Sequence, residues 1–255
     1  MQNDSTDRVR DNLTGLEWQR ADFAAASSWQ DAVEGCSNSS HGGQSDWRLP
    51  TVHELFSITD ETRVNPAVDT GVFSGFDSES GAFWTSDAYG DGGSAWEVMM
   101  NSSVGGASDK TQGSLQSLCV RGASAVVGNH FSESTVHSAE LVTDTLTGLV
   151  WQKSIASGKT WSQALSHCEG STAGGRGDWR LPNKKELLSI LDFGESEPAS
   201  LFPGISTGNF WASTTSNYQQ DKAWYVRFSD GKIYREAKTT EYSVLCVRTP
   251  LRDNG

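Results

Sequence analysis

The sequence lacks the features that identify several classes of protein. No run of 18 apolar residues occurs, so no segment is expected to insert into a membrane. There is no Gly-x-Ser-x-Gly elbow and no phosphate-binding loop. The five histidines show no metal-ligand spacing. We therefore expect a protein without enzymatic activity and without a resident cofactor.

Basic residues are scarce in the first half of the chain. Residues 1–125 hold 7 Lys and Arg against 18 Asp and Glu, a net charge of −11, whereas the remaining residues hold 13 and 14, a net charge of −1. An acidic surface repels nucleic acid and anionic lipid, so neither is expected as a partner. Simple solubility, or adaptation to a salty medium, would also explain this charge.

All ten tryptophans and all four cysteines belong to one pattern that occurs twice. The offset is 133 at the first pair, 132 in the middle and 127–128 at the end, far longer than the roughly 20–50 residues of a solenoid unit. The sequence therefore predicts two domains, residues 1–125 and 138–252, with the tryptophans mainly in their cores. The pairs are Trp18 and Trp151, Trp29 and Trp161, Trp47 and Trp179, Trp84 and Trp211, and Trp96 and Trp224.

Equivalent cysteines in the two copies predict one disulfide in each domain, Cys36–Cys119 and Cys168–Cys246. Each bond would close a loop of roughly 80 residues. A zinc site is a weaker alternative because close-set ligand pairs are absent, and a free catalytic thiol would not need a repeated partner. Disulfides place the protein in an oxidising compartment, either extracellular, at the cell surface or periplasmic.

Two short helices are expected in each copy. Residues 29–36 and 161–168 place apolar side chains at i, i+3, i+4 and i+7, and Thr160 is a suitable N-cap for the second of these helices. The next helix begins with a capping box, in which a capping residue precedes a glutamate by three positions. These pairs are Thr51 with Glu54 and Asn183 with Glu186. Both glutamates resemble catalytic residues when considered alone, but we assign them to the helix starts.

Strand patterns follow the helices. Residues 96–99 and 223–228 alternate between apolar and polar side chains, residues 229–232 have the composition of a hairpin turn, and residues 243–248 form a final strand with the last cysteine. This order predicts an α+β domain with two helices, an antiparallel sheet and a disulfide between the first helix and the last strand.

Four ordered motifs, each present twice, resemble the Lcl C-terminal-domain-like family. They are Leu-Thr-Gly-Leu-x-Trp, Trp-Arg-Leu-Pro, Phe-Trp-x-Ser and Cys-Val-Arg, and the resemblance covers nearly all of both halves. It implies tandem C-type-lectin-like domains in a secreted or surface-displayed binding or adhesion module of bacteria. Glycan is the leading ligand class that it implies, with an extracellular matrix protein as an alternative. A structural part in a larger surface assembly is the other functional hypothesis.

The calcium-dependent sugar site of C-type lectins cannot be transferred to this chain. Those lectins bind calcium through a Glu-Pro-Asn or Gln-Pro-Asp motif. The most similar segment here is Glu197-Pro198-Ala199, but it precedes the strand that contains Phe210-Trp211 and has no amide side chain. Trp84 and Trp211 are followed by Thr-Ser and Ala-Ser instead of Asn-Asp. The redox chemistry of formylglycine-generating enzymes, which share the lectin-like architecture, has no cysteine left to use.

The loops between the Phe-Trp and Ala-Trp strands are the predicted binding regions, because rigid scaffolds carry function on loops. Each contains one tyrosine among hydrogen-bonding side chains, although an ordinary hairpin loop would look the same. The candidate residues are Asp87, Tyr89 and Asp91 in the first copy, and Asn217, Tyr218 and Asp221 in the second. The second loop is favoured because its domain is nearly neutral. The three aspartates could also hold calcium, but their spacing matches no EF-hand.

The Trp-Arg-Leu-Pro motif is predicted to be structural. Residues 47–50 and 179–182 are identical in the two copies, whereas the loops around them diverge. We expect the tryptophans of this motif to be buried, and Arg48 and Arg180 to be paired with acceptors.

Overall fold

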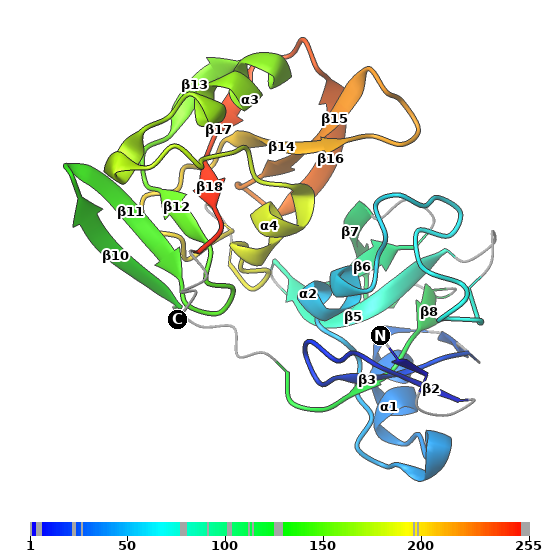
Figure 1. The fold of residues 1–255 in the computed structure, drawn as a ribbon. Helices are drawn as coiled ribbons and strands as arrows, with labels where there is room; N and C mark the ends of the chain where they lie inside the picture. Colours follow the sequence, from blue (N-terminus) through cyan, green and yellow to red (C-terminus); the bar gives the residue numbers. More distant parts are fainter. Residues whose placement is uncertain are drawn as a thin grey trace. The chain divides into compact units, whose positions relative to one another are not determined.

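The computed structural model describes residues 2–3, 7–21, 24–26, 28–76, 81–90, 92–100, 104–111, 113, 115–124, 130–195, 197 and 199–250. The chain divides into two compact units, residues 1–125 and 126–255. Each unit contains two small sheets and two short helices, and the second repeats the element order of the first (Figure 1).

The first unit contains a four-stranded sheet and a five-stranded sheet. In order across the first sheet lie β1 (Gln2–Asn3), β2 (Arg8–Arg10), β3 (Glu17–Gln19) and β9 (Val120–Arg121). Across the second lie β4 (Ala24–Ala26), β8 (Leu115–Ser117), β5 (Ala82–Tyr89), β6 (Ser94–Met99) and β7 (Val104–Asp109). The helices are α1 (Trp29–Ser37) and α2 (Val52–Ser57), with a 3-10 turn at His41–Gly43. All pairings are antiparallel except that of β5 with β8.

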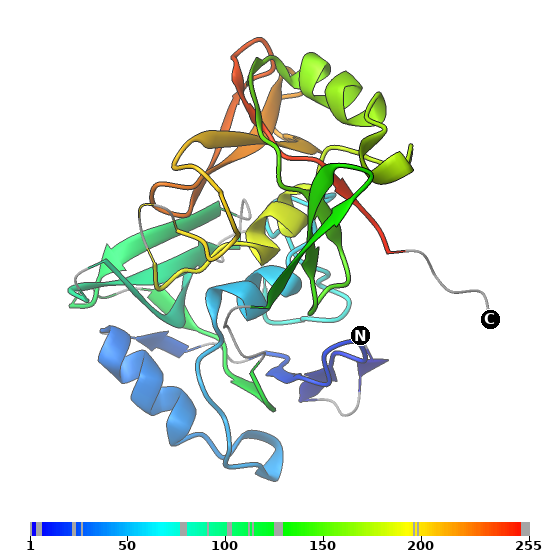
Figure 2. The ribbon, with the colours of Figure 1, turned by 90° about the vertical axis from the view of Figure 1, so that its left-hand side faces the viewer.

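The second unit has the same organisation. Its four-stranded sheet contains β10 (Phe131–Val136), β11 (Ala139–Asp144), β12 (Val150–Gln152) and β18 (Val247–Arg248). Its five-stranded sheet contains β13 (Ala156–Lys159), β17 (Tyr242–Val244), β14 (Asn209–Thr215), β15 (Lys222–Arg227) and β16 (Lys232–Ala237). Helix α3 (Trp161–Glu169) packs on β13 and β14, and α4 (Lys184–Ser189) packs on β14 and β15. Figure 2 shows the green hairpin of β10 and β11 apart from the orange β15–β16 hairpin.

These units correct the predicted α+β, C-type-lectin-like fold. Each is mostly β, with strands divided between two sheets and with helices of only nine and six residues. The additional sheet was missed because strands such as β3 and β12 have three residues each, too few to show a period of two. Their partners β9 and β18 lie about a hundred residues further along the chain.

Both predicted disulfides are present, and they join α1 to Cys119 and α3 to Cys246. We expected the second cysteine of each bond to lie within the last strand. It lies between two strands instead. Cys119 separates β8 from β9, and Cys246 separates β17 from β18. Each bond therefore ties the first helix to the point where the chain leaves one sheet and enters the other. Disulfides indicate an oxidising environment.

None of the helices in the described part of the chain has the length and apolar character that a membrane crossing requires.

The predicted helix starts are confirmed. Thr160 caps α3, and α2 and α4 each begin with a complete capping box. In α2 the Thr51 hydroxyl accepts the Glu54 N–H at 3.2 Å, and the Glu54 carboxylate accepts the Thr51 N–H at 2.8 Å. Two of the backbone donors that a helix leaves unpaired are satisfied in this way.

Eight of the ten tryptophans are buried, with exposures of 4% or less, which confirms their place in the cores. Trp29 and Trp161, the first residues of α1 and α3, are the half-buried exceptions. Their indole N–H groups donate to the carbonyls of Thr85 and Ala212. A lysine lies over each ring, with the ammonium nitrogen 4.2 Å from the ring centroid in both units. The first helix of each unit is thus anchored to its five-stranded sheet.

Replacing Lys110 by methionine should lower the stability of the first unit by about 0.5–1 kcal/mol, because the Trp29 ring would lose the cation above it. Methionine keeps the aliphatic contact, so the difference reports the charge. Thermal unfolding should show a small decrease in melting temperature. An unchanged melting temperature would mean that the cation contributes nothing to the anchor.

Candidate functional site

The predicted binding loop of the second unit joins β14 to β15. Asn217, Tyr218 and Asp221 are all exposed, and Tyr218 retains 45% of its accessible surface. Ser216, which is completely buried, fixes the base of the loop. Its hydroxyl accepts the Gln219 N–H at 3.3 Å, and its own N–H donates to the Lys222 carbonyl at 3.0 Å. The loop therefore presents an exposed tyrosine from a fixed base.

The structure adds Arg235, from β16, to this tyrosine. The guanidinium carbon of Arg235 lies 5.1 Å from the centroid of the Tyr218 ring and 5.1 Å from that of the Trp224 ring. Strand register explains the second contact, because Trp224 and Arg235 are directly opposite one another on β15 and β16. The Nζ of Lys184, a completely buried residue of α4, lies 4.2 Å from the Trp224 centroid.

Arg235 differs from the other arginines in the described ranges, since it alone has no hydrogen bond or ion pair to a protein acceptor. A guanidinium carries five N–H donors in its plane. Contact with aromatic faces leaves these in-plane donors available. Arg235 is half-buried, and none of its nitrogen atoms is among the buried polar atoms that lack a partner, so its donors are accessible to solvent. The arrangement is suited to binding an anion.

The tyrosine beside the corresponding loop of the first unit is packed differently. Tyr89 is the last residue of β5, and its ring contacts the Trp96 ring edge-on at a centroid distance of 5.1 Å. Ala107 lies opposite Trp96, at the register position that Arg235 occupies in the second unit. Val52 stands at the position of Lys184. Both cations around the second unit's tryptophan are therefore absent from the first.

The predicted aspartates do not form a calcium site among the described residues. The Asp87 carboxylate accepts the Val52 N–H at 2.6 Å and so serves the start of α2, a role that the Thr214 hydroxyl takes for α4. Asp91 lies outside the described residues. Within the described ranges, no three acidic, histidine or cysteine side chains are grouped to hold a metal ion.

The arginines of the repeated motif are paired, as predicted. Arg48 donates two hydrogen bonds to the Glu54 carboxylate, at 2.8 and 2.7 Å, and Arg180 donates two to Glu186, at 2.7 and 2.6 Å. Burial alone would raise the pKa of Glu54. The hydrogen bonds from Arg48 and from the Thr51 N–H outweigh burial and lower this pKa below its ordinary value. The glutamate of the capping box therefore also holds the motif's arginine.

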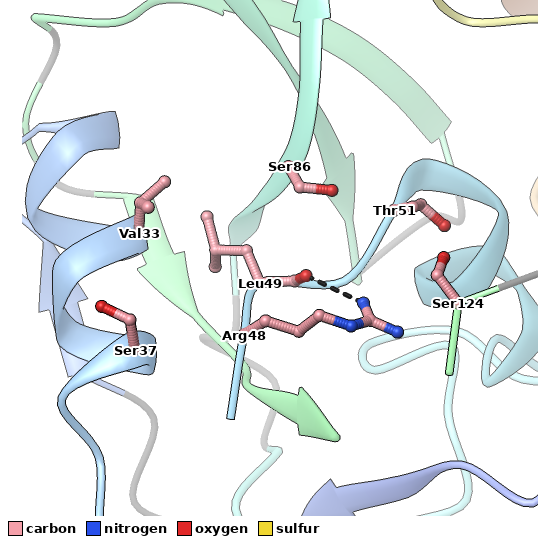
Figure 3. Close-up of a pocket in the computed structure, with 7 residues that line it drawn as sticks. All are labelled: Val33, Ser37, Arg48, Leu49, Thr51, Ser86 and Ser124. Atoms are coloured by element: carbon pink, nitrogen blue, oxygen red, sulfur yellow. Dashed lines mark hydrogen bonds between the residues drawn. The ribbon is translucent and has the colours of Figure 1, made fainter. Parts of the chain in front are cut away.

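A pocket of about 320 Å³ lies beside Arg48 in the first unit. Figure 3 shows Val33 and Leu49 at one end of it, and the Arg48 guanidinium reaching toward Thr51 and Ser124 at the other. Arg48 already donates to Glu54 and to the Leu49 and Gly122 carbonyls. In the second copy, larger side chains stand at three lining positions. Leu165, Glu169 and Asn183 replace Val33, Ser37 and Thr51.

The contact between Arg235 and Trp224 was missed at the sequence level, although a signal for it existed. The turn at residues 229–232 was recognised, and continuing its hairpin backwards places Trp224 opposite Arg235. The approach of Tyr218 to Arg235 had no comparable signal, because Tyr218 belongs to a loop and not to a strand register.

A search of curated proteins returns no match. A model of the Lcl C-terminal domain family matches residues 7–121 and again residues 140–248. Each match lies within one structural unit, and together they cover most of the chain. The chain therefore belongs to the Lcl C-terminal domain family and contains two tandem copies of its domain.

Proposed function

We propose that this protein is a secreted or surface-displayed recognition module, without enzymatic activity, whose second domain binds an acidic glycan. Family membership indicates a surface or secreted module, and the two disulfides indicate an oxidising compartment. The observation that carries the proposal is Arg235, which lies over Tyr218 and Trp224 and has no acceptor among the described residues.

The chemistry of this site suits a sugar that bears a carboxylate or sulfate. The in-plane edge of a guanidinium donates two parallel hydrogen bonds to such a group. The exposed ring of Tyr218 offers an apolar face beside it for the C–H groups of the sugar. The sequence from residue 126 onward is also nearly neutral, at −1, whereas residues 1–125 at −11 repel an anionic ligand.

Calorimetric titration of the full chain should detect binding of a hyaluronan hexasaccharide, which is carboxylated, or of a heparin hexasaccharide, which is also sulfated. Arg235→Ala should weaken this binding by about tenfold to a hundredfold, because hydrogen bonds to charged groups contribute about 1.5–3 kcal/mol. Arg235→Lys keeps the charge but not the planar fork, so its affinity should be intermediate. Added salt should weaken binding to the wild-type protein.

Matched controls come from the chain and from the ligand. Tyr218→Ala should weaken binding, whereas Tyr89→Ala, beside the corresponding loop of the first unit, should leave it unchanged. A carboxyl-reduced hyaluronan hexasaccharide should bind equally to the wild-type protein and to Arg235→Ala. Equal affinity of these two proteins for the acidic hexasaccharides would refute the Arg235 site. If no glycan binds at all, a structural part in a surface assembly becomes the better account.

A further inference from the structure

A row of aromatic side chains crosses the five-stranded sheet of the second unit on the face opposite to Arg235. Side chains alternate along β15, so Tyr225 faces away from Trp224. The register places Tyr225 opposite Trp211 on β14 and opposite Tyr234 on β16. The row ends on β17 at Tyr242, whose ring centroid lies 4.8 Å from that of Trp211 and 4.5 Å from that of Tyr225. We call these four residues the aromatic row.

Part of the aromatic row remains accessible. Of its four members, Trp211 is completely buried, but Tyr225, Tyr234 and Tyr242 are only half-buried. The rings of Tyr225 and Tyr234 stack with centroids 5.6 Å apart. Burial, together with a hydrogen bond to Tyr242, raises the pKa of Tyr225 well above its ordinary value. The Tyr225 hydroxyl is therefore engaged with Tyr242 within the row.

An arginine that is fixed by an ion pair borders the row at Tyr234. The Arg227 guanidinium carbon lies 4.8 Å from the Tyr234 ring centroid, and Nη2 donates to the Tyr234 hydroxyl at 2.8 Å. Nε and Nη2 also donate to the Asp230 carboxylate, which neutralises the charge. Among the described residues, Nη1 has no acceptor. The border of the row thus offers N–H donors without a net charge.

The first unit shows that the fold does not require these tyrosines. At the same register positions its sheet carries Leu115, Trp84, Glu97 and Gly106. Only the buried tryptophan is shared, and the Glu97 carboxylate accepts a hydrogen bond from the Ser108 hydroxyl at 2.6 Å. The same two-sheet architecture therefore forms without the three tyrosines. Tyr225 and Tyr242 pack against the core of the second unit, which accounts for the buried part of their rings, and the exposed part of the row is what the first unit lacks.

We propose that the aromatic row binds the apolar face of a neutral, extended oligosaccharide. Aromatic rings provide flat apolar contacts, and the tyrosine hydroxyls and Arg227 Nη1 can exchange hydrogen bonds with sugar hydroxyls. The ring centroids of Tyr242 and Tyr225 lie 4.5 Å apart and those of Tyr225 and Tyr234 lie 5.6 Å apart, so the accessible part of the row is longer than a single sugar ring. This inference rests on the proposed glycan recognition, but it uses the opposite sheet face and needs no anionic group.

Titration of the full chain with cellohexaose, a neutral linear oligosaccharide, tests this proposal. We expect saturable binding that Tyr234→Ala weakens by about tenfold or more. Tyr234→Phe keeps the ring and should retain affinity within about threefold. Arg235→Ala should leave cellohexaose binding unchanged. Because the first unit carries glycine at this position, Tyr234→Ala should fold, and its melting curve verifies that.

The outcomes for the two glycan sites are separable. Binding of cellohexaose that depends on Tyr234 but not on Arg235 supports the aromatic row, even if the acidic hexasaccharides fail to bind. Two results overturn it: the absence of cellohexaose binding to the wild-type protein, and equal affinities of the wild-type protein and a folded Tyr234→Ala variant.

Discussion

Replacing both Cys168 and Cys246 by alanine should destabilise the second domain by about 4 kcal/mol. The bond spans a sequence separation of 78 residues, and a closed loop of that size removes about this much chain entropy from the unfolded state. The bond also holds α3 to the crossing between β17 and β18. A loss of this size is a large part of the stability of a small domain.

The loss should be confined to the domain that carries the substitution. Because two domains need not unfold together, hydrogen exchange resolved along the chain is the suitable measurement. Exchange in residues 130–250 should accelerate, while the core of residues 7–124 keeps its protection. The Cys36→Ala and Cys119→Ala pair is the matched control, with the opposite pattern expected. A loss below about 1 kcal/mol in either domain would show that the bond contributes little to stability.

Replacing Arg48 by alanine should lower the stability of the first domain by about 2–3 kcal/mol at neutral pH. Glu54 is only 5% exposed, and the substitution removes both of its hydrogen bonds from Arg48. Breaking a buried pair from one side leaves an uncompensated charge, which costs about 3–5 kcal/mol. The expected value is smaller because the Arg48 side chain is 31% exposed.

The pH dependence of this variant distinguishes a lost charge partner from lost packing. In the wild-type protein the pKa of Glu54 is lowered, so its stabilising contribution is present above the ordinary pKa and is lost as pH falls through the lowered value. Without Arg48, burial should raise this pKa. The stability deficit should then grow as pH rises from about 4 to about 7.

Two further variants sharpen this test by denaturant unfolding. Adding Glu54→Gln to Arg48→Ala should recover part of the loss at neutral pH, because it removes the unpaired charge. Arg180→Ala should cost less, since the Arg180 and Glu186 side chains are more exposed, at 38% and 15%. A deficit that is independent of pH would indicate that Arg48 acts through packing alone.

Local chemistry made the helices predictable from the sequence. The capping boxes at Thr51 and Asn183 and the apolar spacing of residues 29–36 involve neighbours within one or two turns. The disulfides were predictable for another reason, because the duplication placed equivalent cysteines in both copies. Likewise, the recurrence of Arg48 and Arg180 in the repeated motif indicated their structural role.

The sheets were not predictable by the same means. Strand β12 pairs with β18, so its partner lies almost a hundred residues away, and neither strand exceeds three residues. The final strand predicted at residues 243–248 is broken at Leu245 and Cys246, where the chain changes sheets. Such a break depends on which surfaces the two sheets bury, which is a tertiary property. The lectin-like expectation failed for this reason.

The candidate site was only partly predictable. The composition of the loop around Tyr218 indicated a binding region, and the nearly neutral charge of the second domain favoured that copy. Arg235 was not among the predicted site residues, since its contact with Tyr218 requires both a strand register and the path of a loop. The aromatic row likewise depends on pairing across four strands.

The central claim is that one scaffold occurs twice and that the second copy recognises an acidic glycan. An NMR titration of the full chain with hyaluronan hexasaccharide tests it most directly, because both copies are observed in one sample. We expect saturable shifts in the amides around Tyr218, Trp224 and Arg235, and none around Tyr89, Trp96 and Ala107. Equal shifts in the two domains, shifts centred on the first domain, or no saturable shift would contradict the claim.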